Sequence, residues 1–149
     1  MNISPCTVAD IERAPNLAAL LAEYGAESAI AGLGEAEAQL DLYRAMEASG
    51  ALHTAAAYQG DTLIGFLLFV VSTLPHYGKR IATTESFFVA SARRQSGAGL
   101  ALLREAEALA APLGAEGLFV TAPAGSKLEY VMSRQPYRQT NSVFFRRLT

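Results

Sequence analysis

The chain is poor in the residues that build disulfides and metal sites. It has one cysteine and two histidines among 149 residues. The single thiol, Cys6, cannot form a disulfide within the chain, and no group of cysteines and histidines has the spacing of metal ligands. We therefore expect no metal cofactor, and we interpret Cys6 as a packed side chain rather than a nucleophile.

Charge is also scarce and nearly balanced. Charged residues make up 17% of the chain, and the formal net charge is −2 at pH 7. A nucleic-acid-binding domain is normally clearly basic, so this balance argues against a nucleic-acid partner. Hydrophobic residues make up 51% of the chain, a composition that is typical of globular rather than disordered proteins. The length then predicts a single domain over residues 1–149.

Long apolar segments are missing as well. The longest runs from Leu63 to Val71, includes Gly65, and is far too short to cross a bilayer as a helix. No basic segment followed by an apolar one stands at the N-terminus, so we expect no secretory signal. These absences lead us to expect a cytoplasmic protein without a membrane partner.

What is present is a change of hydrophobic period along the chain. The patterns predict a strand over 2–8, helices around 17–24 and over 35–48, strands over 52–58, 62–71 and 81–89, a helix ending at 113, a strand over 117–122, a helix over 126–134 and one or two closing strands within 137–148. Three consecutive strands argue against a doubly wound parallel sheet. We therefore predict an α/β (α+β) fold with a mixed, mostly antiparallel central sheet of six or seven strands, flanked by about four helices.

The stretch from Glu85 to Leu113 has the clearest functional pattern. A buried strand, Ser86-Phe87-Phe88-Val89, is followed by a turn with two arginines and two glycines, and then by a long Ala/Leu helix. A strand, a basic glycine turn and a helix start direct backbone N–H groups and the positive end of the helix dipole at an anion. The absence of a Cβ at Gly97 and Gly99 allows a phosphate to come close. We call this turn the anion cradle.

Two common phosphate-binding patterns do not match the glycines of the cradle. In a dinucleotide-binding turn the third glycine would fall at Leu102, and the turn would follow the first strand rather than the fourth. A Walker-type loop would end in Gly-Lys-Ser/Thr, which is missing here. A purely structural role stays open, in which Gly97 and Gly99 only let the helix pack closely on the strand.

The sequence Arg94-Gln95-Ser96-Gly97-Ala98-Gly99, between Val89 and Leu102-Leu103, resembles the acyl-CoA-binding motif of the GNAT-type N-acetyltransferases. The resemblance covers nearly the whole chain, because the expected order of elements matches that of the family and so implies a GNAT-like fold. The segment from His76-Tyr77 through Glu85, followed by Phe88-Val89, resembles the small, phage-associated branch of that family.

The resemblance implies acetyl-CoA as co-substrate. The amides from about Gln95 to Leu100 would hold its pyrophosphate, and the strand over 87–89 would splay from the strand over 117–122 and pair with the pantetheine arm. The implied cofactor-binding residues are Phe87, Phe88, Val89, Arg94, Gln95, Ser96, Gly97, Ala98, Gly99 and Leu100. Arg93 is the weaker of the two candidate arginines.

Acetyl transfer to an amine requires removal of a proton from the ammonium. Glu85 is the candidate general base, because it lies where the family commonly places one, and burial in an apolar strand would raise its proton affinity. A strand-end carboxylate facing water is the competing interpretation. The general acid is less clear: Met132 stands where the family often has a tyrosine, so Tyr130 and Tyr137 are the nearest candidates. His76 and Tyr77 are candidate substrate contacts.

The resulting hypothesis is an acetyltransferase that moves an acetyl group directly from acetyl-CoA to a primary amine of a small molecule or peptide. One alternative is a catalytically weak or inactive CoA-binding or regulatory module of the same fold, and another is an interaction domain. The sequence does not identify the acceptor, which the family selects through segments here near 25–37 and 72–82. Homodimers are common in the family, so a homodimer is an expectation by analogy.

Overall fold

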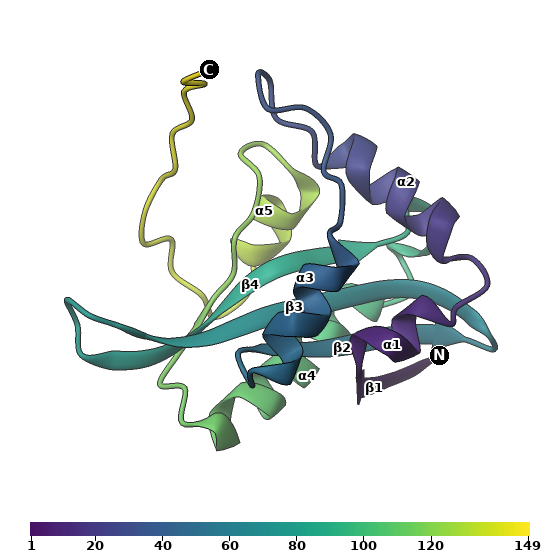
Figure 1. Cartoon of the computed structure of the whole chain (residues 1–149), viewed down its shortest axis with the longest axis horizontal. Coiled ribbons are helices and arrows are strands. Elements are labelled where there is room, and N and C mark those ends of the chain that lie inside the picture. The colour runs from purple at the N-terminus through teal and green to yellow at the C-terminus, as the bar shows by residue number, and fades with distance from the viewer.

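The structure is a computed structural model that describes all residues from 1 to 149. Its elements, labelled in Figure 1, are β1 (Asn2–Cys6), α1 (Val8–Glu12), α2 (Leu17–Glu27), α3 (Leu40–Ala48), β2 (Leu52–Gln59), β3 (Thr62–Leu74), β4 (Lys79–Val89), a 3-10 helix (Ser91–Arg93), α4 (Ala98–Ala110), a second 3-10 helix (Ala111–Leu113), β5 (Leu118–Phe119) and α5 (Lys127–Met132).

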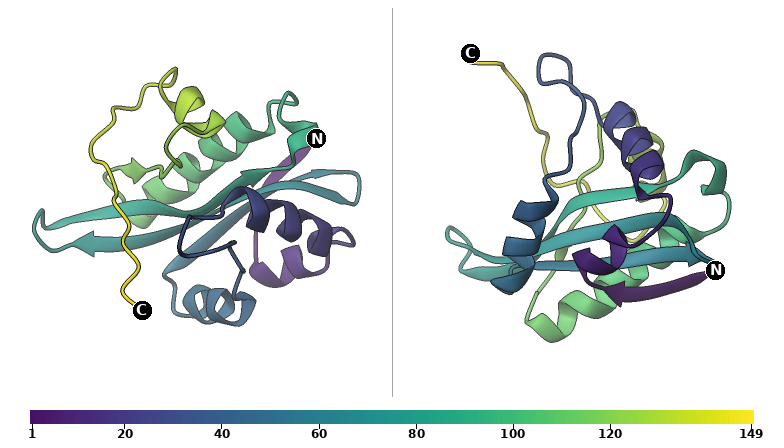
Figure 2. Two further views of the ribbon diagram at one scale, coloured as in Figure 1. Left: turned by 90° about the horizontal axis from the view of Figure 1, so that it is seen from above. Right: turned by 45° about the vertical axis from the view of Figure 1, so that its right-hand side comes forward.

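The five strands form one sheet in the order β1-β2-β3-β4-β5. Neighbouring strands run antiparallel except β4 and β5, which are parallel. Figure 2 shows α1, α2 and α3 on one face of the sheet and α4 on the other. This arrangement confirms the predicted mixed, mostly antiparallel sheet between two layers of helices.

The hydrophobic core has two halves because β3 is buried on both faces. Phe66 and Leu68 pack with the α1–α2 side, whereas Leu67 and Phe69 pack with α4. Successive side chains of a strand point to opposite faces, so a continuous apolar run serves both layers. The Ala/Leu pattern of α4 supplies its buried side, with five residues of the helix fully or almost fully buried: Ala98, Leu102, Leu103, Ala106 and Ala110.

Two irregularities of β4 shape the region beside the cradle. The register with β3 shifts between Leu68 and Phe69, where Ser86 and Thr84 are the successive partners, so Glu85 is the extra residue of a β-bulge. On its other side β4 pairs with β5 only through Ala82 and Thr83. Beyond this point the strands separate, and the Thr121 N–H donates instead to Thr84 Oγ1 at 2.9 Å.

The predicted count of six or seven strands is wrong, because the expected closing strands within 137–148 do not form. This segment leaves the domain as an extended chain beside the α2–α3 connection (Figure 1), where Arg147 Nη1 donates to the Gly32 carbonyl at 3.2 Å. Val143 and Phe144 are 83% and 92% exposed. An alternating pattern produces a strand only where a partner edge supplies hydrogen bonds, and here the segment has none.

Other boundaries differ for local reasons. The five α-helices include α1, a short helix that was not predicted. Thr7 is its N-cap, and Asp10 completes a capping box. Helix α3 begins at Leu40 rather than at 35. Most of the expected loop over 72–80 belongs to the long β3–β4 hairpin, whose turn is formed by Pro75–Gly78 between the two strands.

Gly65 lets the end of β4 approach β3 closely, just before the cradle. A Cβ at this position would lie 2.9 Å from the Phe88 carbonyl oxygen and 3.2 Å from Leu102 Cδ1. We expect Gly65→Ala to lower the free energy of unfolding by about 1–3 kcal/mol, because backbone has to move to make room. Urea unfolding measures this change. Gly99→Ala is the matched control, since its Cβ meets only Val89 Cγ2 at 3.9 Å; an equal loss in both variants would contradict the steric cause.

Candidate active site

The cradle forms where β4 turns into α4. Gly97 is the N-cap of α4 and has a φ of 85°, the left-handed conformation that favours glycine. Four backbone N–H groups around it, those of Gln95, Gly97, Gly99 and Leu100, have no hydrogen-bond partner in the structure. By contrast, the Ala98 N–H donates to Ser96 Oγ. The turn therefore presents free donors at the positive end of α4.

These four residues face a cavity of about 380 Å³ between β4, the cradle and α5. One wall is the β4 segment Phe87–Val89, whose outer edge has no partner strand. The opposite wall comes from α5 and the segment before it. The lining comprises Glu27, Ser28, Phe87, Phe88, Val89, Arg94, Gln95, Gly97, Gly99, Leu100, Leu103, Pro123, Ser126, Lys127, Leu128, Val131 and Met132.

This cavity fits the two parts of a CoA-like molecule. Free N–H groups at a helix start suit a diphosphate, because each donor gains a charged acceptor without losing another bond. An apolar channel bounded by a free strand edge suits an extended amide-containing arm, which can add hydrogen bonds to that edge. Of the predicted cofactor-binding residues, all except Ser96 and Ala98 line the cavity.

Arg94 is engaged inside the protein rather than directed at the cavity alone. Its Nε donates to the Val89 carbonyl at 3.0 Å, its Nη2 pairs with Glu27, and its guanidinium lies 5.3 Å from the centre of the Phe88 ring. The Glu27 carboxylate raises the pKa of Arg94 through this bond. Glu23 of the same helix accepts from the Ser91 N–H at 2.7 Å. Two carboxylates of α2, those of Glu23 and Glu27, thus contact the segment that leads into the glycine turn.

A cation that the sequence analysis missed lies on the other wall. Lys127, at the start of α5, lines the cavity and forms no ion pair. Its position relative to the cradle depends on how the chain returns after β5. The local signal was the cap residue Ser126, which fixes where α5 begins but not which cavity it faces.

Glu85 lies on β4 just before the channel wall Phe87–Val89 and does not itself line the cavity. It is exposed, so the burial that was expected to raise its proton affinity is absent. The Tyr43 hydroxyl of α3 reaches Glu85 Oε1 at 3.5 Å, and both Tyr43 and Tyr24 lie 3.2 Å from the buried Ser86 Oγ. Sequence analysis did not identify these three hydroxyls, which come from three different elements.

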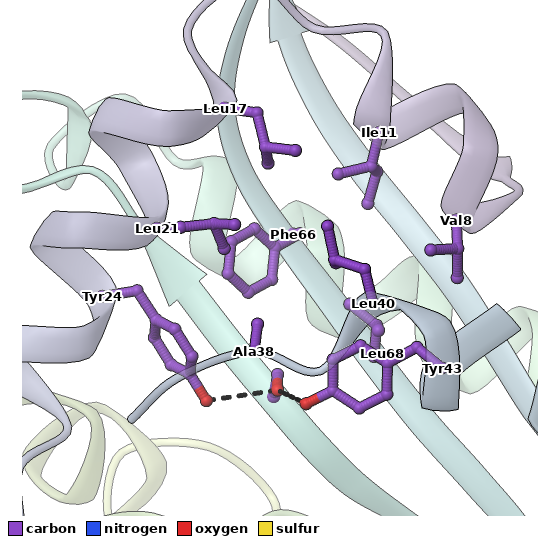
Figure 3. A pocket seen from close by; sticks show the side chains of 11 residues that line it. Val8, Ile11, Leu17, Leu21, Tyr24, Ala38, Leu40, Tyr43, Phe66 and Leu68 are labelled. Carbon is purple, nitrogen blue, oxygen red and sulfur yellow. Dashed lines mark hydrogen bonds between the residues drawn. The ribbon is translucent and has the colours of Figure 1, made fainter. Parts of the chain in front are cut away.

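The three hydroxyls close one end of a small apolar pocket of about 20 Å³ between the helices and the sheet (Figure 3). Its other walls are aliphatic and aromatic side chains of α1, α2, α3 and β3. In Figure 3 the hydroxyl groups of Tyr24 and Tyr43 point toward each other from opposite sides of the pocket, and each lies 3.2 Å from Ser86 Oγ. Phe66 and Phe88 each lie 5.5 Å from the Tyr24 ring centre and hold that ring in place.

The candidate general acids do not meet at this site. Tyr130 is 61% exposed and stacks under the guanidinium of Arg134. The Tyr137 hydroxyl donates to Glu107 Oε1 at 2.6 Å on α4, and burial together with this bond raises the Tyr137 pKa. Neither tyrosine lines the cavity, whereas Met132, which has no proton to donate, does.

The remaining candidates lie away from the cradle. The ring centres of His76 and Tyr77 lie 4.0 Å apart in the turn of the β3–β4 hairpin, at the opposite end of β4 from the cradle. Burial raises the pKa of the Cys6 thiol to about 12, which fits a packed and unreactive side chain. No group of three or more metal-binding side chains occurs in the structure. None of its helices combines the length and hydrophobicity needed to cross a membrane.

One protein-family model matches most of the chain. The family model described as "Acetyltransferase (GNAT) family" matches residues 14–126. No curated protein matches the chain.

Solved structures share the fold at low sequence identity. The ribosomal-protein-alanine N-acetyltransferase from Brucella melitensis biovar Abortus 2308 superposes with a TM-score of 0.73 at 18% identity, covering 99% of this chain and 100% of that one. An aminoglycoside acetyltransferase from an uncultured soil metagenomic sample gives 0.75 at 18%, covering 99% and 98%. An aminoglycoside 6'-N-acetyltransferase from Acinetobacter haemolyticus gives 0.66 at 19%, covering 100% and 99%.

Proposed function

The chain belongs to the GNAT family of acetyltransferases, and we propose that it transfers an acetyl group from acetyl-CoA directly to a primary amine of a small molecule or peptide. The observation that carries this proposal is the set of four unpaired N–H groups facing one cavity. Any helix start leaves such donors free, but here they open on a cavity that also has a free strand edge, the combination that a diphosphate with an extended amide arm requires.

Each wall of the site has a proposed role. The amides of Gln95, Gly97, Gly99 and Leu100 bind the diphosphate, and the edge of β4 orients the arm that carries the acetyl thioester. When bound, acetyl-CoA supplies an activated acyl group. Glu85 accepts the proton of the acceptor's ammonium, directly or through water, because its carboxylate is exposed and an amine can reach it.

The alternative of a weak or inactive CoA-binding module has one observation in its favour. Met132 occupies the cavity wall, and neither Tyr130 nor Tyr137 lines the cavity, so neither candidate tyrosine is placed to protonate the departing thiolate. A thiolate is a tolerable leaving group, so a missing acid slows the reaction more than it prevents it. This is why we favour the enzyme over the inactive module.

Two measurements test the proposal. Acetyl-CoA at about 100 times its Kd should stabilise the folded protein by about 2.7 kcal/mol, seen as a higher melting temperature. Thiol release with polyamines, aminoglycosides, amino acids and peptide N-termini then detects turnover. Stabilisation without turnover on any amine would favour the inactive module, and no stabilisation would leave the interaction domain.

Lys127 should contribute long-range attraction for the diphosphate. We expect Lys127→Gln to raise the Kd for acetyl-CoA about 3- to 10-fold, and more at low ionic strength, because one unpaired positive charge is removed from the cavity wall. Isothermal titration calorimetry at two salt concentrations measures this effect. Lys79→Gln is the matched control, since Lys79 pairs with Glu116 at the start of β4 and should leave the Kd unchanged. A Kd for Lys127→Gln equal to that of the parent, or a ratio of the two that does not change with salt, would contradict this role.

The acceptor and the assembly are also proposals. The amine enters from the side of the α2–α3 connection, where Glu35 and Glu37 are exposed and favour a cationic acceptor.

A homodimer and a cytoplasmic location stay predictions, which light scattering and cell fractionation test.

A further inference from the structure

A hydrogen-bonded chain of hydroxyls leads from the interior of the protein to Glu85. Tyr24 of α2 and Tyr43 of α3 each lie 3.2 Å from Ser86 Oγ, and Tyr43 continues to Glu85 Oε1 at 3.5 Å. Ser86 is 5% exposed, whereas Glu85 faces solvent. The chain therefore connects a buried group to the one carboxylate that the proposed function requires.

The direction of the chain follows from counting protons. An ionised carboxylate only accepts, and each hydroxyl has a single proton to donate. If Tyr43 donates to Glu85, Ser86 must donate to Tyr43, and Tyr24 must donate to Ser86, which is the direction that the geometry of the Tyr24 hydroxyl supports. All three protons then point toward Glu85, and no hydroxyl has to donate twice.

We infer that Tyr43 is a positioning residue for Glu85, and that Ser86 and Tyr24 orient Tyr43 in turn. An exposed glutamate at a β-bulge has several free torsions, and fixing them costs conformational entropy. A hydrogen bond from a ring that is itself held by packing offsets this cost and keeps the carboxylate where an amine can reach it. The 3.5 Å separation is long for such a bond, and closure around substrates shortens contacts of this kind.

The neighbours of Tyr43 support its role as a donor. Burial, the largest cause, raises the pKa of the Tyr43 phenol; the bond with Ser86 lowers it, and the nearby Glu85 carboxylate and Tyr24 raise it. The phenol therefore keeps its proton at neutral pH and remains able to donate. Glu85 and Tyr24 are the ionisable groups that act on it.

The first test follows the titration of Tyr43 itself and needs no substrate. We expect Glu85→Gln to lower the Tyr43 pKa and Ser86→Ala to raise it, read from the ring carbon next to oxygen in a ¹³C NMR titration and assigned with Tyr43→Phe. Tyr58 is the internal control, since burial, Cys6 and Asp10 raise its pKa without Glu85. A Tyr43 titration that both variants leave unchanged would overturn the chain.

The second test is kinetic and rests on the proposed function. With the best amine of the panel, Tyr43→Phe should lower kcat about 5- to 10-fold with the KM for acetyl-CoA unchanged, Tyr24→Phe about twofold, and Tyr58→Phe not at all. In the Glu85→Gln background, Tyr43→Phe should cause no further loss, because its effect passes through that carboxylate. An additive loss, or an unchanged kcat in Tyr43→Phe while Glu85→Gln is slow, would overturn the inference.

The two tests separate this inference from the function on which it rests. If Glu85→Gln turns over as fast as the parent, Glu85 is not the base, and the kinetic role of Tyr43 fails with it. If no amine turns over, the titration alone decides whether Tyr43 contacts Glu85.

Discussion

Gly99→Asp should abolish acetyl-CoA binding at micromolar concentrations while leaving the fold intact. Gly99 is the second residue of α4, lines the cavity and contributes one of the four free N–H groups. A carboxylate here lies where we place the diphosphate. Like charges about 4 Å apart near a protein surface repel by about 4 kcal/mol, so even with screening by salt we expect the Kd to rise about 100-fold or more.

The same substitution should not damage the protein. A Cβ at Gly99 meets only Val89 Cγ2, at the ordinary distance of 3.9 Å, and aspartate in the first turn of a helix is stabilised by the helix dipole. Calorimetric titration with acetyl-CoA, together with the melting temperature of the free protein, measures both effects.

Gly99→Asn separates charge from size, because it has the same shape without the charge. We expect Gly99→Asn to raise the Kd about 10-fold or less, which corresponds to about 1.4 kcal/mol. The rest of the loss in Gly99→Asp is then due to the negative charge. Equal binding by the parent and Gly99→Asp would show that the cradle does not hold the diphosphate. An equal loss of affinity in Gly99→Asp and Gly99→Asn would show that the size of the side chain, not its charge, is the cause.

The cradle was predictable from sequence because its cause is local. A glycine in the left-handed conformation at a helix N-cap is set by residues within a few positions, here Ser96 to Gly99. The same holds for the two halves of the core, since the unbroken apolar run of β3 dictates burial on both faces. Local patterns of this kind can be recognised in the sequence without knowledge of the tertiary structure.

Features that depend on distant segments were not predictable. Tyr24, Tyr43 and Ser86 come together only after α2 and α3 have packed on β4, and Lys127 reaches the cavity only once α5 has packed beside it. The ion pair between Arg94 and Glu27 could not be predicted from the sequence either, because the two residues are 67 positions apart. The closing strand within 137–148 failed for the complementary reason: its pattern is local, but its partner is not.

Glu85 was predictable in part: its identity and strand come from local sequence, but the bulge depends on pairing with β3. Sequence alone placed a carboxylate in the strand before the cradle, and the structure adds that the residue is the unpaired one of the β3–β4 ladder. A bulge interrupts the regular alternation of a strand: Ser86 pairs with Leu68 and Thr84 with Phe69, so the exposed Glu85 has no partner on β3.

Glu85→Gln should therefore lower kcat without affecting cofactor affinity. Glutamine keeps the size of the side chain and its contact with Tyr43 but cannot accept the ammonium proton, so we expect kcat to fall about 100- to 1,000-fold, within the usual range for a general base. The Kd for acetyl-CoA should stay within about twofold, because Glu85 does not line the cofactor cavity. Single-turnover thiol release and calorimetric titration measure the two quantities.

Two further properties make this prediction specific. Raising the pH should partly restore Glu85→Gln, because at high pH more of the acceptor amine is already neutral and no longer needs a base. Glu116→Gln, at the far end of the β4–β5 pair where Glu116 contacts Lys79, is the matched control and should keep the parent kcat at every pH. A Glu85→Gln enzyme that is slow at all pH values, or one that loses acetyl-CoA affinity in parallel, would assign Glu85 to the architecture of β4 rather than to proton transfer.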